Sequence, residues 1–109
     1  MNKKVKEKWI KALRSGKYKQ TRMGVLRTKR NAFCCLGVLC DVVDPKSWQK
    51  KDSNAYDDHY SHQGHDTWPT NSITGKLGIT PDTVITLVKL NDDAHYSFNK
   101  IADWVEKNL

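Results

Sequence analysis

The sequence predicts an α+β fold, in which three to four helices pack on a short antiparallel β-hairpin or sheet. The chain has 109 residues, the size of one domain, and 38% of them are hydrophobic and 28% charged, as in a small folded protein. Apolar residues recur at helical spacing near both ends of the chain. Residues 17–30 lack this spacing and begin with an alternating pattern instead. Helices that flank strands, rather than alternating with them, are typical of the α+β class.

Residues 2–14 form the first predicted helix. Val5, Trp9 and Leu13 share one face at a period of 3.6 residues, and lysines line most of the remaining surface. Asn2 stands where a helix cap is favoured. The helix therefore has an apolar face for the core and a basic face for solvent or a partner.

Residues 17–30 lack this period and predict a β-hairpin with its turn at residues 23–24. Cross-strand neighbours in a hairpin lie about 5 Å apart, so two or three basic side chains could converge on one phosphate. An arginine suits this role because its planar fork donates two parallel hydrogen bonds to phosphate. The candidate phosphate-binding residues are Lys17, Lys19, Arg22, Arg27, Lys29 and Arg30.

Positive charge is concentrated at the start of the chain. The net charge of the whole sequence is +7, but residues 1–30 hold twelve Lys or Arg and one acid, whereas residues 31–109 have a net charge of −4. Such a field attracts nucleic acid, nucleotides, anionic lipid or an acidic protein surface. We interpret it as a binding surface for an anionic partner, with a merely solvated surface as the alternative.

Residues 32–43 predict a core helix that contains the spacing C-C-x4-C. On a helix, Cys34, Cys35 and Cys40 point in different directions, and the second cysteine pair of a structural zinc site is missing. Their neighbours are apolar, so we interpret all three as packing residues rather than metal ligands or reactive thiols. Gly37 is weak in a helix but allows a neighbouring segment to approach closely.

Residues 46–79 predict a long polar loop, with a weak strand near residues 47–51 as the alternative. A nucleobase could stack on an aromatic ring in this loop or in the hairpin, and the candidates are Tyr18, Trp48 and Trp68. The loop also holds an H-x2-H-x2-H motif that could bind a divalent ion. Its members and the neighbouring acids are His59, His62, His65, Asp57, Asp58 and Asp66. No ordered element is evident to preorganise them, so we expect neither a metal nor another cofactor.

Residues 81–107 predict two further helices. Thr80 and Ser97 are favoured cap residues, and Pro81 suits the first helical position. The apolar faces of all the predicted helices supply the expected core: Trp9, Leu13, Phe33, Leu36, Leu39, Cys40, Val84, Leu87, Phe98, Ile101 and Trp104.

The motifs of common enzyme classes are missing from the sequence, including phosphate-binding glycine loops, a nucleophile elbow and H-E-x-x-H. No apolar run approaches the roughly 20 residues that span a bilayer. The basic start is not followed by the apolar segment of a secretory signal. We therefore expect a cytosolic protein that is neither an enzyme nor bound to a membrane.

Three stretches resemble a set of small, mostly uncharacterised proteins of tailed phages and prophages. They read KWIKALRSGKYKQTRMGVLR, FCCLGVLCD and LVKLNDDAHYSFNKIADWVE, and the resemblance covers roughly residues 8–44 and 87–107. It brings no catalytic residue. It implies an accessory protein that acts in the cytoplasm of an infected bacterium, where such proteins often block host machinery or immunity by binding.

These observations favour a non-enzymatic protein that sequesters a small nucleotide, such as a second messenger of bacterial immunity. A homo-oligomer would suit this role, because a symmetric dimer can close two half-sites around one ligand. One alternative is an inhibitor directed at a host defence protein, such as a nuclease or a CRISPR effector. Direct nucleic-acid binding is another, although no helix-turn-helix, RNA-recognition or zinc-finger signature supports it.

Overall fold

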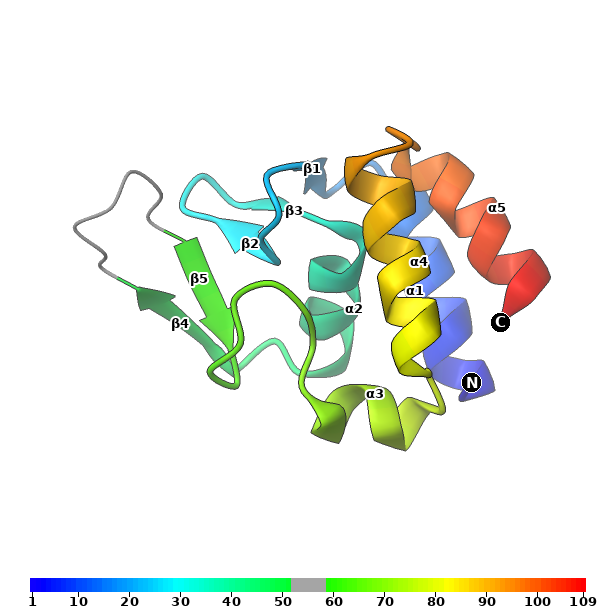
Figure 1. The fold of residues 1–109 in the computed structure, drawn as a ribbon, viewed down its shortest axis with the longest axis horizontal. Helices are drawn as coiled ribbons and strands as arrows, with labels where there is room; N and C mark the ends of the chain where they lie inside the picture. Colours follow the sequence, from blue (N-terminus) through cyan, green and yellow to red (C-terminus); the bar gives the residue numbers. More distant parts are fainter. Residues whose placement is uncertain (52–58) are drawn as a thin grey trace.

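A small mixed β-sheet packs on one side of a group of helices (Figure 1). The computed structural model describes residues 1–51 and 59–109. The helices in these residues are α1 Lys3–Arg14, α2 Cys35–Val43, α3 Asn71–Leu77, α4 Pro81–Asp92 and α5 Phe98–Asn108. The strands are β1 Lys19–Gln20, β2 Arg27–Thr28, β3 Ala32–Phe33, β4 Trp48–Lys51 and β5 His59–His62. The predicted α+β class is confirmed, with one helix more than the upper number expected.

The helix caps follow the sequence closely. The side-chain oxygens of Asn2, Thr80 and Ser97 each accept a hydrogen bond from the backbone N–H three residues later, at 3.0, 3.2 and 3.2 Å. Pro81 is the first residue of α4, where its missing N–H costs no helical hydrogen bond. The starts predicted from these three caps are therefore confirmed to within a residue.

The sheet has the strand order β1-β3-β2-β5-β4, and only the β1–β3 pair is parallel. The hairpin predicted within residues 17–30 is wrong, because β3 lies between β1 and β2. Thr21 donates its backbone N–H to the carbonyl of Phe33 at 2.8 Å, which holds the end of β1 on β3. Strands of two residues carry no alternation long enough to specify their partner, so the sequence pattern could not reveal this order.

The core helix begins later than predicted, at residue 35 instead of 32. Residues 32–33 form β3, and Cys34 then caps α2 in an extended conformation. The sulfur of Cys34 accepts the backbone N–H of Gly37 at 3.3 Å, as a serine or threonine oxygen would. Cys34 thus lies between β3 and α2 and caps the start of the helix.

The loop predicted for residues 46–79 is wrong in two places. Residues 48–51 pair with residues 59–62 as antiparallel strands, which confirms the alternative of a strand near 47–51. The chain then turns through Gln63 and Gly64, both at positive φ, and later forms α3. This helix has seven residues and buries only Ile73, Thr74 and Leu77, so its apolar period was too short to recognise.

Helix α2 lies between the sheet and the other helices, and six consecutive residues of it are buried (Figure 1). Nine of the eleven predicted core residues are buried, whereas Val84 and Trp104 are partly buried at the edge of the core. Trp9 of α1 is fully buried, and its indole N–H donates to the carbonyl of Cys35 at 3.0 Å. The core also includes buried apolar residues outside the predicted helices, among them Leu26, Ile73, Leu77 and Ile79.

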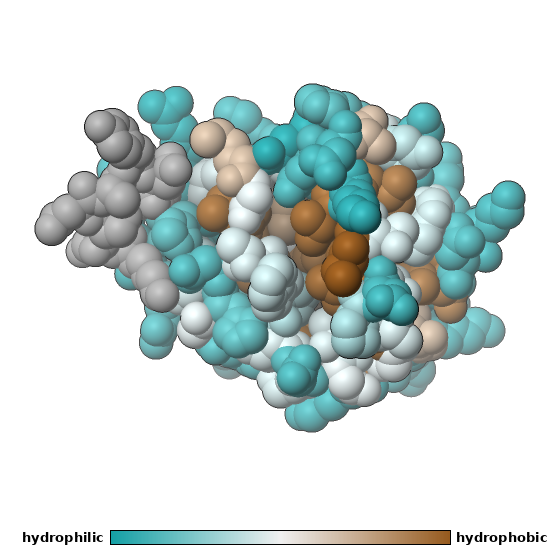
Figure 2. Space-filling model, viewed as in Figure 1, coloured by the Kyte–Doolittle hydropathy of each residue, from teal (hydrophilic) through white to brown (hydrophobic). Residues whose placement is uncertain are grey.

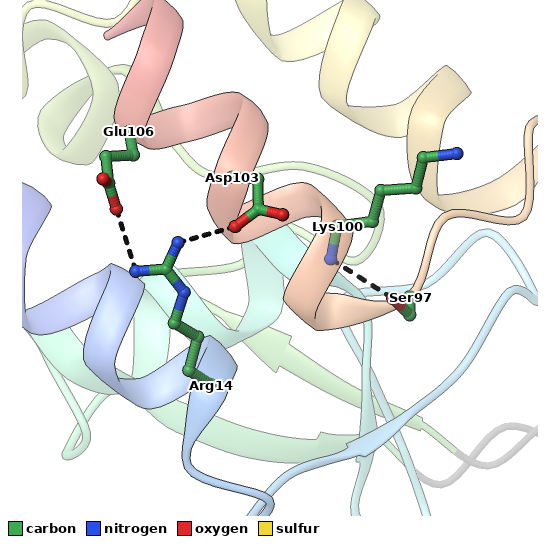
Figure 3. A network of polar contacts seen from close by, with 5 residues as sticks. All are labelled: Arg14, Ser97, Lys100, Asp103 and Glu106. Carbon is green, nitrogen blue, oxygen red and sulfur yellow. Dashed lines mark hydrogen bonds and ion pairs between the residues drawn. The ribbon is translucent and has the colours of Figure 1, made fainter.

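Helices α1 and α5 are also joined at the surface by ion pairs (Figure 3). The guanidinium of Arg14 lies between two carboxylates of α5, at 2.7 Å from Asp103 and 2.8 Å from Glu106. These pairs are exposed, and such pairs add little free energy because water and salt screen them. Their effect is to orient the ends of the two helices.

A buried amide joins the sheet to α2 and α4. The Oδ1 atom of Asn91 accepts hydrogen bonds from Gln20 Nε2 at 2.8 Å and from the backbone N–H of Cys35 at 3.2 Å. Its Nδ2 atom donates to the carbonyl of Thr21 and to Asp92 Oδ1, both at 2.8 Å. Every donor and acceptor of this fully buried side chain is therefore used.

Candidate anion-binding site

One end of the sheet carries a hollow of about 610 Å³, which we call the basic hollow. Its lining combines three cationic side chains and a histidine with short polar and apolar residues. These are Lys19, Gln20, Thr21, Met23, Val25, Thr28, Lys29, Arg30, Ala32 and His59.

Strand register explains why these residues meet. Lys19 on β1 is paired with Ala32 on β3, and Thr28 on β2 is paired with His59 on β5. The backbone N–H of Ala32 donates to Thr28 Oγ1 at 3.1 Å, which joins the two pairs. Four strands therefore contribute residues to one row across the sheet, although these residues lie up to 40 positions apart in the sequence.

The turn between β2 and β3 places two further cations at this row. It consists of Lys29, Arg30 and Asn31, and the backbone N–H of Asn31 donates to the carbonyl of Thr28 at 3.0 Å. Asn31 has a φ of 60°, as expected for the last residue of a three-residue hairpin loop. Lys29 and Arg30 are exposed and line the hollow from this turn.

The charges around the basic hollow favour an anion. Lys19, Lys29 and Arg30 contribute three positive charges, and the neighbouring carboxylate of Asp66 lies 3.4 Å from His59 Nε2. A lysine binds phosphate as a point charge and an arginine binds it through a fork of N–H donors. The polar side chains of Gln20 and Thr28 add hydrogen-bonding capacity to the lining.

Arg27 lies outside this hollow, in a cage of aromatic rings. Its guanidinium carbon is 4.1 Å from the ring centre of Tyr60, 5.1 Å from Phe33 and 5.3 Å from Trp48. Its Nε and Nη2 atoms donate to Asn31 Oδ1 at 3.1 and 2.7 Å. Arg27 was predicted to bind phosphate. In the structure its guanidinium makes cation–π contacts and hydrogen bonds within the protein, and these contacts hold the sheet together.

The remaining two basic candidates lie in different places. Arg22 Nη2 contacts the carbonyls of His95 and Tyr96, both at 3.3 Å, and so joins the chain after β1 to the α4–α5 connection. Lys17 lines a shallow hollow beside α1 and α5. Of the six predicted cations, the structure therefore brings together Lys19, Lys29 and Arg30.

Of the three predicted stacking aromatics, Trp48 is part of the aromatic cage and Tyr18 packs beside it, on Phe33. The hydroxyl of Tyr18 donates to Asp41 Oδ2 at 2.5 Å, and the indole N–H of Trp48 donates to Asp41 Oδ1 at 3.0 Å. Burial, followed by this bond to the carboxylate, raises the pKa of Tyr18 to about 12. The ring of Tyr18 also packs edge-on against Phe33, with 5.0 Å between ring centres. Neither aromatic lines the basic hollow.

Trp68 differs from these two, because 55% of its surface is exposed. It lines a second hollow of about 370 Å³, next to α4. It is thus the predicted stacking residue that a ligand could reach directly.

The candidate metal motif is dispersed by the β4–β5 hairpin. His59 lines the basic hollow, whereas His62 is fully buried and its Nε2 lies 2.8 Å from the carbonyl of Asp44. His65 pairs with His62 through the backbone across a tight turn. Asp57 and Asp58 lie outside the described residues. Within residues 1–51 and 59–109, no group of three His, Cys, Asp or Glu side chains is placed to hold a metal ion.

All three cysteines are buried and reduced, as the packing interpretation predicts. Burial raises the pKa of Cys34 to about 11 and moves the pKa values of Cys35 and Cys40 well above the usual range for a thiol. Their thiols are therefore neutral at physiological pH, which disfavours both nucleophilic attack and metal binding.

Thiol burial predicts a loss of stability at alkaline pH. A thiol whose pKa is higher in the folded state contributes stability that is complete below the unfolded pKa near 9 and is lost as the pH rises. Each such thiol should lower the free energy of unfolding by about 1.4 kcal/mol per pH unit between its two pKa values. Urea unfolding from pH 8 to pH 10.5 measures this, and Cys40→Ala should make the decline shallower. Rapid reaction of native protein with Ellman's reagent at pH 8 would contradict it.

Sequence reasoning missed several lining residues of the two hollows, including Gln20, Thr28 and Asp92. The charge pattern correctly pointed to the first 30 residues as the source of the cations. It could not separate cations that line a hollow from cations that pack on aromatic rings. The string L-N-D at residues 90–92 belongs to one of the stretches that resemble phage proteins. That it links the sheet to the helices can be seen only in the tertiary structure.

The fold and the hollow define a small α+β protein with a cationic recess at the end of a mixed sheet. Over residues 1–109 the chain matches the family model described as Domain of unknown function (DUF8296), and it belongs to this family. Comparison with curated proteins and with solved structures gave no match. None of the helices in the described residues combines the length and apolar composition needed to span a bilayer.

Proposed function

We propose that this protein is a non-enzymatic binder of a small phosphate-bearing ligand. The observation that carries the proposal is the meeting of Lys19, Lys29 and Arg30 on one hollow. They come from an edge strand and from the turn between two other strands, so the tertiary structure gathers them. The volume of about 610 Å³ lies in the range typical of small-molecule sites.

A nucleotide is the ligand class that suits this recess best. Three clustered cations can contact the phosphates of a di- or triphosphate, whereas a long nucleic acid requires a stripe of cations that follows its backbone. The resemblance to phage accessory proteins suggests the cellular context in which this binding would occur. In that setting the protein would act in the cytoplasm of an infected bacterium and sequester a nucleotide messenger of immunity.

The proposal predicts that reversing two charges of the basic hollow weakens ligand binding strongly. The double variant Lys19→Glu/Arg30→Glu changes two exposed side chains and should lower affinity for the bound nucleotide at least tenfold, because phosphate contacts become repulsive. Calorimetric titration with a panel of mono-, di-, tri- and cyclic nucleotides identifies the ligand and measures the change. Circular dichroism confirms that the variant is folded.

A matched control is the double variant Lys4→Glu/Lys8→Glu. It changes the net charge equally but alters exposed residues of α1 that line none of the hollows described above. Its affinity should stay within about threefold of the wild type, since distant exposed charges are largely screened at physiological salt. Equal weakening by both variants would contradict a localised site. Folded wild-type protein that binds no nucleotide of the panel would refute the proposal.

A further inference from the structure

The second hollow, of about 370 Å³, lies beside the basic hollow, and we call it the apolar hollow. Figure 2 shows apolar surface near the centre of the same face as in Figure 1, over α4. The residues that line it come from α2, α4 and two connecting segments. They are Gly24, Val25, Cys34, Cys35, Leu36, Thr67, Trp68, Val88, Asn91 and Asp92.

The two hollows are neighbours because they share a wall. Val25 lines both of them, Met23 lines the basic hollow and Gly24 lines the apolar one. The segment 23–25 is therefore a ridge with cations on one side and an apolar recess on the other. Met23 is 70% exposed on this ridge, so its flexible side chain lies where a ligand spanning both recesses would pass.

The chemistry of the apolar hollow suits a flat ring. Leu36, Val88 and the neutral thiol of Cys34 supply apolar walls, and the exposed indole of Trp68 offers a stacking surface. Stacking of a base on an aromatic side chain contributes about 1–3 kcal/mol per base. This large aromatic side chain is half exposed beside an apolar recess, and a ring stacked on it would cover its exposed face.

One polar group in this hollow indicates which ring it would accept. Asp92 is one of the residues that line the hollow, and its carboxylate Oδ1 accepts a hydrogen bond from Asn91 Nδ2 at 2.8 Å. A carboxylate can accept about four hydrogen bonds in all. It therefore retains capacity to accept from the edge of a ring, and guanine presents two adjacent N–H donors on that edge, whereas adenine presents a donor beside an acceptor.

We propose that the two hollows are the two halves of one nucleotide site, with the phosphates in the basic hollow and a guanine base in the apolar hollow. The base stacks on Trp68, and its N–H edge donates to Asp92. This inference rests on the proposed function, because it requires the phosphates to bind beside Lys19, Lys29 and Arg30. It adds the identity of the organic part of the ligand.

The test compares GTP with inorganic tripolyphosphate, which carries a triphosphate but no base. Calorimetry should show that wild-type protein binds GTP at least tenfold tighter than tripolyphosphate. Trp68→Ala should reduce the GTP affinity to that of tripolyphosphate and leave tripolyphosphate binding within twofold. Asp92→Asn, whose amide oxygen can still accept from Asn91, should remove a preference for GTP over ATP. The control Ile85→Ala removes a different exposed apolar side chain, which belongs to α4 and does not line the hollow, and should change neither affinity.

The outcomes separate the two proposals. Equal affinity of wild-type protein for GTP and tripolyphosphate would overturn the base-binding inference and leave the phosphate site standing. A GTP preference that survives in Trp68→Ala would also overturn it, as would a wild-type preference for ATP over GTP. Absence of binding for both ligands would overturn the inference together with the proposed function. Thermal unfolding of each variant verifies that the fold is retained.

Discussion

Replacing Gly37 with alanine should lower the free energy of unfolding by about 3 kcal/mol or more, since overpacking a rigid contact typically costs 1–3 kcal/mol and a hydrogen bond is disturbed as well. A Cβ atom at this position would lie 1.9 Å from the carbonyl oxygen of Leu26 and 2.8 Å from its carbonyl carbon. These are backbone atoms, so no side-chain rotation can relieve the clash. The same oxygen accepts the backbone N–H of Cys34 at 3.1 Å, so a shift would also loosen the start of α2.

The measurement is a urea or thermal unfolding curve, in which the midpoint temperature should fall by roughly 10–20 °C for a domain of this size. The matched control is Gly75→Ala in α3, where an added Cβ meets nothing within 4 Å. Alanine is the better helix former by about 1 kcal/mol, so this control should be neutral or stabilising. Equal stability of wild type and Gly37→Ala would show that the contact between α2 and the segment before β2 is not as close as described.

Replacing Asn91 with alanine should lower the free energy of unfolding by about 3–5 kcal/mol, because each buried partner left unsatisfied costs about 1–3 kcal/mol. The variant removes the acceptor of the Cys35 N–H and of Gln20 Nε2, and the donor to the carbonyl of Thr21. The Nε2 atom of Gln20 keeps one partner, the carbonyl of Tyr96 at 2.9 Å. The buried backbone groups of Cys35 and Thr21 would bear most of the loss.

Chemical denaturation of Asn91→Ala measures this change, with Asn99→Ala as its matched control. Asn99 is an exposed residue of α5, so its replacement should change the free energy of unfolding by less than about 0.5 kcal/mol. Similar effects of the two substitutions would contradict a central role for the buried amide. Leucine at position 91 should not restore stability, because it supplies no partner for the same polar groups.

Asn91 also explains how the helices position the candidate site. Gln20 and Thr21, which Asn91 binds, line the basic hollow, while Asn91 and its neighbour Asp92 line the apolar hollow. One side chain of α4 therefore sets the position of both recesses relative to each other. Substitutions at this residue should consequently disturb ligand binding and stability together, unlike substitutions at Arg30 or Trp68.

The helices could be predicted because their signals are local. The capping residues Asn2, Thr80 and Ser97 act on N–H groups three positions away, and the periods of α1 and α5 fit within a dozen residues. The same reasoning failed for α3, which has seven residues, and for strands of two residues. Elements this short receive their stability from tertiary partners, and those partners leave no mark in the nearby sequence.

By itself the sequence determined the class of fold, the starts of α1, α4 and α5, most of the core, the burial of the cysteines and the concentration of positive charge in the first 30 residues. Only the tertiary structure decided which charges meet. Arg27 and Arg30 are three positions apart, yet one packs on three aromatic rings and the other lines the basic hollow. The physical reason is that charge is a property of a residue, whereas a binding site depends on strand order and register, which long-range pairing between β1, β3, β2 and β5 sets.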